Sequence, residues 1–245
     1  MTNMERIILI ETSTALCSAA ICEDGAIKSY RESSAPKAHA SLTAVFIKEM
    51  LDEINLEMSD IDAVCVSMGP GSYTGLRVGV STAKGLCFGA GKPMLAVGTL
   101  DILVEQARLE QTITANDAQG NEITRHFDDF KYIVPMIDAR RMEVYSAVYN
   151  SQGRVSETQP VIVDENSFIE LLSEGPVLFI GDGAGKCAGV IKHPDAAFLQ
   201  CFPKASSMGK PATEEFHSKN FRDVAYFEPF YLKEFVATTS KKKLF

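Results

Sequence analysis

Two stretches of this chain repeat the same order of predicted elements, and this repeat restricts the fold more than any other feature. Each stretch begins with three segments typical of β-strands, followed by a helix, a buried strand, a glycine-rich turn and a second helix. In the first stretch we expect these elements at 6–13, 16–22, 26–31, 39–55, 61–67 and up to about 90, with a further strand at 93–97 and a helix at 99–109. In the second stretch we expect them at 132–139, 142–149, 155–163, 165–172, 177–181 and after 185. A repeated unit of this kind predicts an α/β protein built from two related halves.

The region between the two stretches, residues 110–129, is polar, as in NDAQGN and RHFDD. A long loop or domain junction is the predicted structure here. We therefore expect two ββαβα-type halves, an N-terminal half at 1–109 and a smaller C-terminal half at 110–224. The apolar residues from Phe230 to Phe235 predict that the segment 225–245 packs back on the first half.

Charge and hydropathy exclude several classes of protein. The net charge of −8 and the pI near 5.1 argue against a broad nucleic-acid-binding face. No apolar run approaches the ~18–20 residues that a membrane span requires. The six cysteines include no C-x-x-C pair and several lie in apolar runs, which predicts buried thiols rather than disulfides or a zinc site. We expect a soluble, cytoplasmic protein with no membrane partner.

The segment GPGSYTGLRVGVSTAKG, from Gly69 to Gly85, is the most distinctive local sequence. Its spacing fits neither a P-loop nor the dinucleotide-binding G-x-G-x-x-G. It does fit a glycine turn that leads into a helix, whose first N–H groups could hold an anion. A plain strand-to-helix turn explains the same residues, and spacing alone leaves both interpretations open.

Acidic and hydroxyl residues follow the first strand of each half. Glu11-Thr12-Ser13-Thr14 follows the first, and Asp138 follows its counterpart. This arrangement resembles the plan of the actin-like ATPase and sugar-kinase superfamily, in which such residues face a nucleotide phosphate and its magnesium. The candidates for a nucleotide cleft are Glu11, Ser13, Asp138, Gly181 and Gly183. The alternative is that these side chains cap strand ends and turns.

Three longer segments resemble the TsaB (YeaZ) family: IETSTALCSAAI, GPGSYTGLRVGVSTAKGL and IDARRMEVYSAVY. The resemblance implies a duplicated actin-like ATPase (ribonuclease H-like) fold. It also implies a partner of TsaD, the protein that transfers threonylcarbamoyl from threonylcarbamoyl-adenylate to N6 of the adenosine next to the tRNA anticodon. A heterodimer with TsaD, a larger assembly with TsaE and a homodimer in isolation are expected by the same resemblance, with tRNA contacted indirectly.

The same resemblance indicates that the chain itself is not catalytic. TsaD continues from the similar segment into a His-x-x-x-His pair that holds its metal, whereas Thr99 and Leu103 fall at those positions here. Neither side chain can replace imidazole as a transition-metal ligand. We therefore expect no catalytic residues, no metal and no cofactor, and leave weak nucleotide binding open.

Two helices carry the candidate partner interface. Gly75, Gly79 and Ala83 form a narrow face on the helix after the glycine turn, which suits close approach of another helix or of the protein's own sheet. The helix from His39 is apolar over more than the ~100° stripe that one core requires, which favours a second contact. The predicted interface residues are Leu42, Val45, Phe46, Gly75, Gly79, Ala83 and Leu86.

Other functions remain as alternatives. A stand-alone small-molecule kinase or ATPase would use the cleft candidates. A peptidase lacks support, because the sequence contains no H-E-x-x-H, His-x-x-x-His or G-x-S-x-G. Arg77, Lys84, Arg140 and Arg141 are candidates for anion or tRNA contacts, although solvated or salt-bridged side chains are the simpler interpretation.

Overall fold

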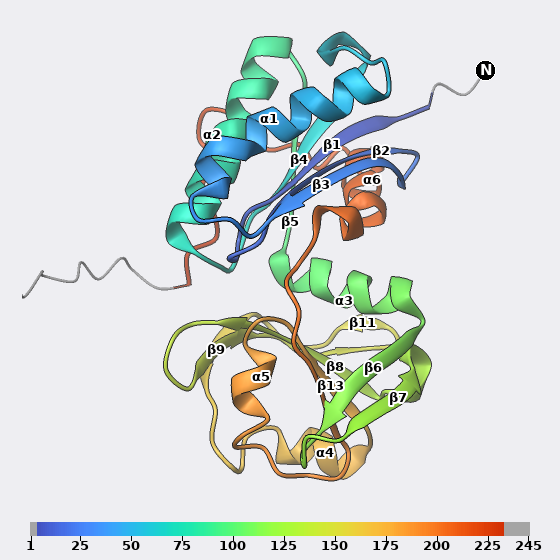
Figure 1. The fold of residues 1–245 in the computed structure, drawn as a ribbon, viewed down its shortest axis with the longest axis vertical. Helices are drawn as coiled ribbons and strands as arrows, with labels where there is room; N and C mark the ends of the chain where they lie inside the picture. Colours follow the sequence, from blue (N-terminus) through green and yellow to red (C-terminus); the bar gives the residue numbers. More distant parts are fainter. Residues whose placement is uncertain (1–3, 233–245) are drawn as a thin grey trace, which may run out of the picture.

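Two β-sheets, each with its own helices, lie one above the other along the long axis of the molecule (Figure 1). The computed structural model describes residues 4–232. Within that range, no helix has the length and hydropathy needed to cross a membrane. The six cysteines all lie in the described part, where they are free thiols and five of them are buried, as predicted.

The first sheet is built from the apolar segments near the N-terminus. Its strands, in chain order, are β1 (Arg6–Glu11), β2 (Cys17–Glu23), β3 (Ala26–Ser33), β4 (Ala63–Ser67) and β5 (Met94–Val97). The strand order is β3-β2-β1-β4-β5. Strand β1 pairs antiparallel with β2 and parallel with β4, and β1 and β4 are buried almost throughout, as expected of central strands.

The second sheet repeats this arrangement. Its corresponding strands are β8 (Tyr132–Asp138), β9 (Glu143–Ser146), β12 (Gln159–Ile162), β13 (Val177–Ile180) and β14 (Ala196–Leu199). They lie in the order β12-β9-β8-β13-β14, with the same parallel and antiparallel pairings as in the first sheet. The predicted duplicated α/β fold of the actin-like type is therefore confirmed.

Four local predictions in the second half were wrong in detail. The predicted strand at 142–149 is divided into β9 and β10 (Tyr149–Asn150), and only short parts of 155–163 pair, in β12. A short β11 (Gly153–Arg154) pairs with β10. The predicted helix at 165–172 appears as α4 (Ile169–Glu174), and α5 (Ala184–Cys187) is a single turn.

The polar region 110–129 is not the predicted loop. It forms the hairpin β6 (Thr112–Asp117) and β7 (Glu122–His126), which extends the second sheet beyond β14. In β6 only Ile113 and Ala115 are buried, and the residues between them are exposed. A strand with one solvated face needs only these two apolar residues, too few for an apolar run in the sequence.

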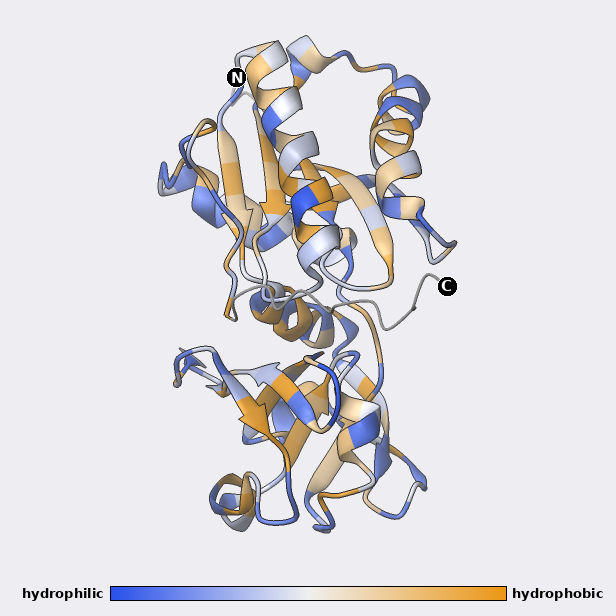
Figure 2. Cartoon of the chain, turned by 90° about the vertical axis from the view of Figure 1, so that its left-hand side faces the viewer, coloured by the Kyte–Doolittle hydropathy of each residue, from blue (hydrophilic) through white to orange (hydrophobic). Residues whose placement is uncertain are grey.

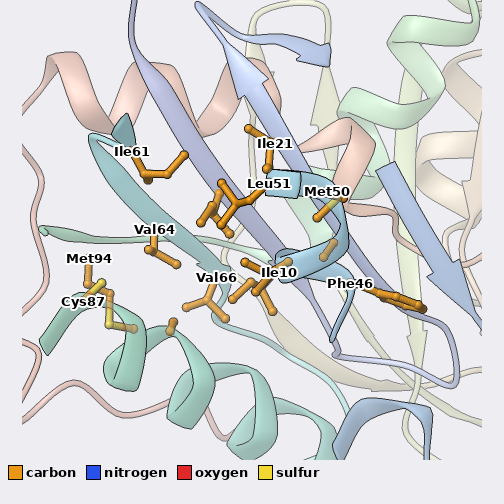
Figure 3. Packing of buried hydrophobic residues seen from close by; sticks show 14 of the residues in the cluster. Ile10, Ile21, Phe46, Met50, Leu51, Ile61, Val64, Val66, Cys87 and Met94 are labelled. Atoms are coloured by element: carbon orange, nitrogen blue, oxygen red, sulfur yellow. The ribbon is translucent and has the colours of Figure 1, made fainter. Parts of the chain in front are cut away.

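The helices are distributed over both halves. Helices α1 (Ala38–Glu53) and α2 (Tyr73–Ala90) cover one face of the first sheet, and their core side chains interlock with those of β1 and β4 (Figure 3). In Figure 2, orange hydrophobic segments occur along strands of both sheets.

The last helix of each half packs on the other half. Helix α3 (Thr99–Glu110) follows β5, yet Leu100, Leu103 and Ala107 belong to the core of the second sheet. Helix α6 (Gly209–His217) follows β14, yet Ala212 packs against the first sheet. Figure 1 shows α3 between the two sheets and α6 beside the first. The chain therefore returns to the first half at α6, whereas the sequence predicted that it returns only from about residue 225 onward.

The segment after α6 also lies against the first half. The backbone N–H of Arg222 donates to the carbonyl oxygen of Met94 (2.8 Å), and that of Phe230 donates to the carbonyl oxygen of Met68 (2.7 Å). The rest of the predicted returning segment, 233–245, lies outside the described residues.

Candidate functional site

The glycines of the segment 69–85 allow α2 to approach the loop that follows β1. A Cβ atom on Gly75 would lie 2.1 Å from the carbonyl oxygen of Thr12, and one on Gly79 would lie 2.2 Å from its hydroxyl oxygen. The Thr12 hydroxyl also donates to the carbonyl oxygen of Gly75 (2.9 Å). Ala83, one turn further along, is fully buried in the hydrophobic core that α1 and α2 form with the first sheet, which we call the first core. The small-residue face therefore packs on the protein's own sheet, which is the alternative that the sequence left open.

Glu11, at the end of β1, is sealed inside the protein. Its side chain is completely buried, and one carboxylate oxygen accepts a hydrogen bond from the backbone N–H of Ser13 (2.5 Å). Burial raises the pKa of Glu11 to about 7, although the Ser13 and Ser67 groups counter part of that shift. A carboxyl group of this kind is half protonated near neutral pH and lies out of reach of solvent ions.

The second half places its own acidic residues at the corresponding strand ends. The Asp182 carboxylate accepts a hydrogen bond from the backbone N–H of Asp138 (2.9 Å), and burial raises the pKa of Asp182 to about 6. The negative charge of Asp182 also raises the pKa of Glu11, so the two carboxyl groups are within electrostatic reach of each other across the two halves. Asp182 was not among the predicted cleft residues; it lies between Gly181 and Gly183 in the sequence and is joined to Asp138 by this hydrogen bond.

The glycines of this second turn are required by the chain itself. A Cβ atom on Gly181 would lie 2.3 Å from the carbonyl oxygen of Met136, and one on Gly183 would lie 2.9 Å from Cγ1 of Val144. Close packing of the turn against β8 and β9 accounts for both glycines. Among residues 4–232, no three or more His, Cys, Asp and Glu side chains gather into a group that could hold a metal ion.

Glu11→Gln is expected to stabilise the chain at pH 8 and to change little near pH 4. The pKa of Glu11 is higher in the folded chain, about 7, than its ordinary value of 4.5, so the folded state binds the proton more tightly. Stability is therefore highest below the unfolded pKa and falls as the pH rises through the folded pKa. We expect a gain of about 2 kcal/mol at pH 8 from urea unfolding.

Glu23→Gln provides the control for this prediction, because the Arg6 guanidinium lowers the pKa of Glu23. That variant should lose stability at pH 8 relative to pH 4, the opposite sign. Parallel pH profiles for wild type and Glu11→Gln would show that Glu11 has an ordinary pKa.

The exposed faces of α1 and α2 in the first half each carry a large apolar side chain. Val45 on α1 is 43% exposed, and Phe88 on α2 is 86% exposed. Leu42 and Leu86 are partly buried at the edge of the first core, whereas Phe46 lies within that core. Of the predicted interface residues, Leu42, Val45 and Leu86 are thus accessible, and Phe46 and the small residues of α2 are not.

Two shallow hollows lie along α2 near Phe88, and both include Gly85. One hollow, of about 430 Å³, is lined by Met58, Ser59, Gly85, Leu86, Gly89 and Ala90. A second, of about 620 Å³, is lined by Lys84, Gly85, Phe88, Asp223, Val224 and Ala225. Nothing lies within 4 Å of a Cβ atom placed on Gly85 or Gly89, so these glycines leave open space beside the ring. We call the surface of Val45, Met58, Leu86 and Phe88 the α1–α2 surface.

Sequence reasoning missed Phe88, although one signal was available. At about 100° per residue, Phe88 lies half a turn around the helix from Gly79. Once Gly79 is known to face the sheet, the opposite face must be exposed. A lone phenylalanine there, with glycines at positions 85 and 89, indicates a contact surface rather than a core.

This chain is similar to known proteins in both sequence and fold. The family model of TsaD, tRNA N6-adenosine threonylcarbamoyltransferase, matches residues 32–169. The chain is 30% identical to the tRNA threonylcarbamoyladenosine biosynthesis protein TsaB of Escherichia coli, over 95% of this chain and 96% of that protein. It is also 30% identical to TsaB of Bacillus subtilis, over 71% of this chain and 70% of that protein. The structure of YeaZ from Pseudomonas aeruginosa shares the fold, with a TM-score of 0.75 and 24% identity over 94% of this chain and 100% of that chain.

Proposed function

Because this chain belongs to the family of the tRNA threonylcarbamoyladenosine biosynthesis protein TsaB, we propose that it binds TsaD and supports threonylcarbamoyl transfer to tRNA. The threonylcarbamoyl group would pass from threonylcarbamoyl-adenylate to N6 of the adenosine next to the anticodon. TsaD would catalyse this transfer. In this proposal the chain is a non-catalytic subunit that forms a heterodimer with TsaD. TsaE joins a larger assembly, and the chain pairs with itself in isolation.

The exposed α1–α2 surface is the observation that carries this proposal. A phenylalanine that is 86% exposed and lines a shallow hollow, with a second hollow next to it on the same helix, is typical of a protein-binding surface. The TsaD family model covers residues 32–169, which include α1 and α2, so TsaD shares this part of the scaffold. Two related chains can pair through the same face about an approximate two-fold axis.

Two features support a non-catalytic role. Glu11 is completely buried, which leaves no open position beside its carboxylate for a hydrated magnesium ion. Leu103, at the position of a metal-binding histidine in TsaD by resemblance, is fully buried in an apolar core. Steady ATP turnover by the isolated chain, lost on Glu11→Gln, would contradict the non-catalytic role and favour the kinase or ATPase alternative.

The test is a mixing experiment by size exclusion with light scattering. The chain is run alone and then with TsaD from the same organism. We expect a dimer of the chain alone, and a one-to-one complex after mixing. Separate elution of the two proteins at micromolar concentration, with TsaE and nucleotide also supplied, would refute the proposed association.

A further inference from the structure

The turn between β8 and β9 has an unusual backbone. Arg140 and Arg141 occupy consecutive positions with positive φ, 71° and 50°. Turns with two positive φ angles normally use Asn-Gly or similar pairs, because a longer side chain is strained there. Two arginines are thus a costly choice for this turn, and such strain is found preferentially at functional sites.

The turn is held in place by Lys186 of α5. Its Nζ donates to the Asp138 carboxylate (2.5 Å) and to the carbonyl oxygens of Arg141 (2.8 Å) and Glu143 (2.6 Å). Asp138 also accepts a hydrogen bond from the backbone N–H of Arg140 (2.7 Å). The Asp138 carboxylate is therefore engaged by Lys186 and by the backbone, so it is not free to neutralise the two guanidinium groups.

The two guanidinium groups differ from all other arginines in the described range. Arg140 and Arg141 are both exposed, and within residues 4–232 neither takes part in an ion pair or a ring contact. Every other described arginine forms an ion pair or lies over an aromatic ring: Arg6, Arg31, Arg77, Arg108, Arg125, Arg154 and Arg222. Among the arginines of residues 4–232, this pair alone is held on a hydrogen-bonded turn without an ion pair or a ring contact.

The turn belongs to the second sheet, where it joins β8 and β9, whereas α1 and α2 cover the first sheet (Figure 1).

We propose that Arg140 and Arg141 bind phosphate groups of the tRNA backbone when the chain is assembled with TsaD; this rests on the proposed function. The planar guanidinium group matches phosphate oxygens in a two-pronged contact. Because the chain carries a net charge of −8, the contact is local and serves to position the RNA rather than to provide most of its affinity. The tRNA contact is then direct, unlike the indirect contact expected from sequence.

The test compares Arg140→Gln/Arg141→Gln with a matched control, Lys37→Gln/Lys219→Gln. The control removes the same charge from two exposed residues that also have positive φ, 65° and 54°. Binding of tRNA to the complex with TsaD is measured by fluorescence anisotropy at several salt concentrations. For the arginine variant, we expect the slope of log affinity against log salt to become shallower by about 1.5, with the control unchanged.

Three results would overturn this inference: equal slopes for the arginine variant and wild type, an equal loss in the lysine control, or no gain in tRNA affinity when the wild-type chain is added to TsaD. Size exclusion of each mixture reports association with TsaD separately. Loss of that association in wild type would refute the proposed function, and it is thereby distinguished from failure of the arginine contact.

Discussion

Replacing Phe88 with aspartate is expected to abolish binding of TsaD and to leave the fold of the chain intact. The ring is 86% exposed, so its loss should change the unfolding free energy by less than about 0.5 kcal/mol. In a complex the ring would fill a pocket at the centre of the contact, where aromatic anchors contribute most of the binding energy. A buried carboxylate without a partner would add a desolvation cost. We expect the affinity to fall at least about 100-fold in a titration with TsaD.

Ile162→Asp is the matched control for Phe88→Asp. Ile162 is 76% exposed on β12 of the second half, away from the α1–α2 surface. This variant should bind TsaD as wild type does. Val45→Glu, on α1, should weaken binding, and Phe88→Asp should also reduce pairing of the chain with itself. A folded Phe88→Asp variant that binds TsaD with wild-type affinity would show that the partner docks elsewhere.

Replacing Gly75 with alanine is expected to destabilise the chain by about 4 kcal/mol, at the upper end of overpacking effects. The new Cβ atom would lie 2.1 Å from the carbonyl oxygen of Thr12. This oxygen belongs to the backbone, so relief requires α2 to move away from the loop after β1. In a chain of this size, such a loss should lower the melting temperature by roughly 10 °C.

Gly89→Ala, on the same helix, should have the opposite effect. Nothing lies within 4 Å of a Cβ atom at Gly89, and alanine is favoured over glycine in a helix by up to about 1 kcal/mol. The two substitutions are chemically identical, so their difference measures the close approach at Gly75 alone. Similar melting temperatures for both variants would mean that α2 does not pack tightly on the loop after β1.

The strands of the first half were predictable because each is a local property of the sequence. Segments such as IILI in β1 and AVCV in β4 are short continuous apolar runs rich in β-branched residues, which are typical of a buried strand. The hairpin β6–β7 lacks such a signal. Its strands are buried on one face only, and the sheet edge that they extend is supplied by β14, some eighty residues later in the chain.

The candidate site was predictable only in part. The sequence pointed to α1 and α2 and to Val45 and Leu86, but it also assigned Phe46, Gly75, Gly79 and Ala83 to the partner. Spacing identifies which residues share a helix face. It carries no information on whether that face meets another protein or the protein's own sheet, because both contacts select small or apolar residues.

The sequence by itself determined the duplication, the order of elements in the first half and the family, because these follow from apolar runs, turn residues and contiguous motifs. Only the tertiary structure decided which face of α2 is buried, how α3 and α6 are exchanged between the halves, and which arginines have no ion pair or ring contact within residues 4–232. The physical reason is that burial and pairing depend on what packs against a residue. In this chain those neighbours come from segments far away in the sequence.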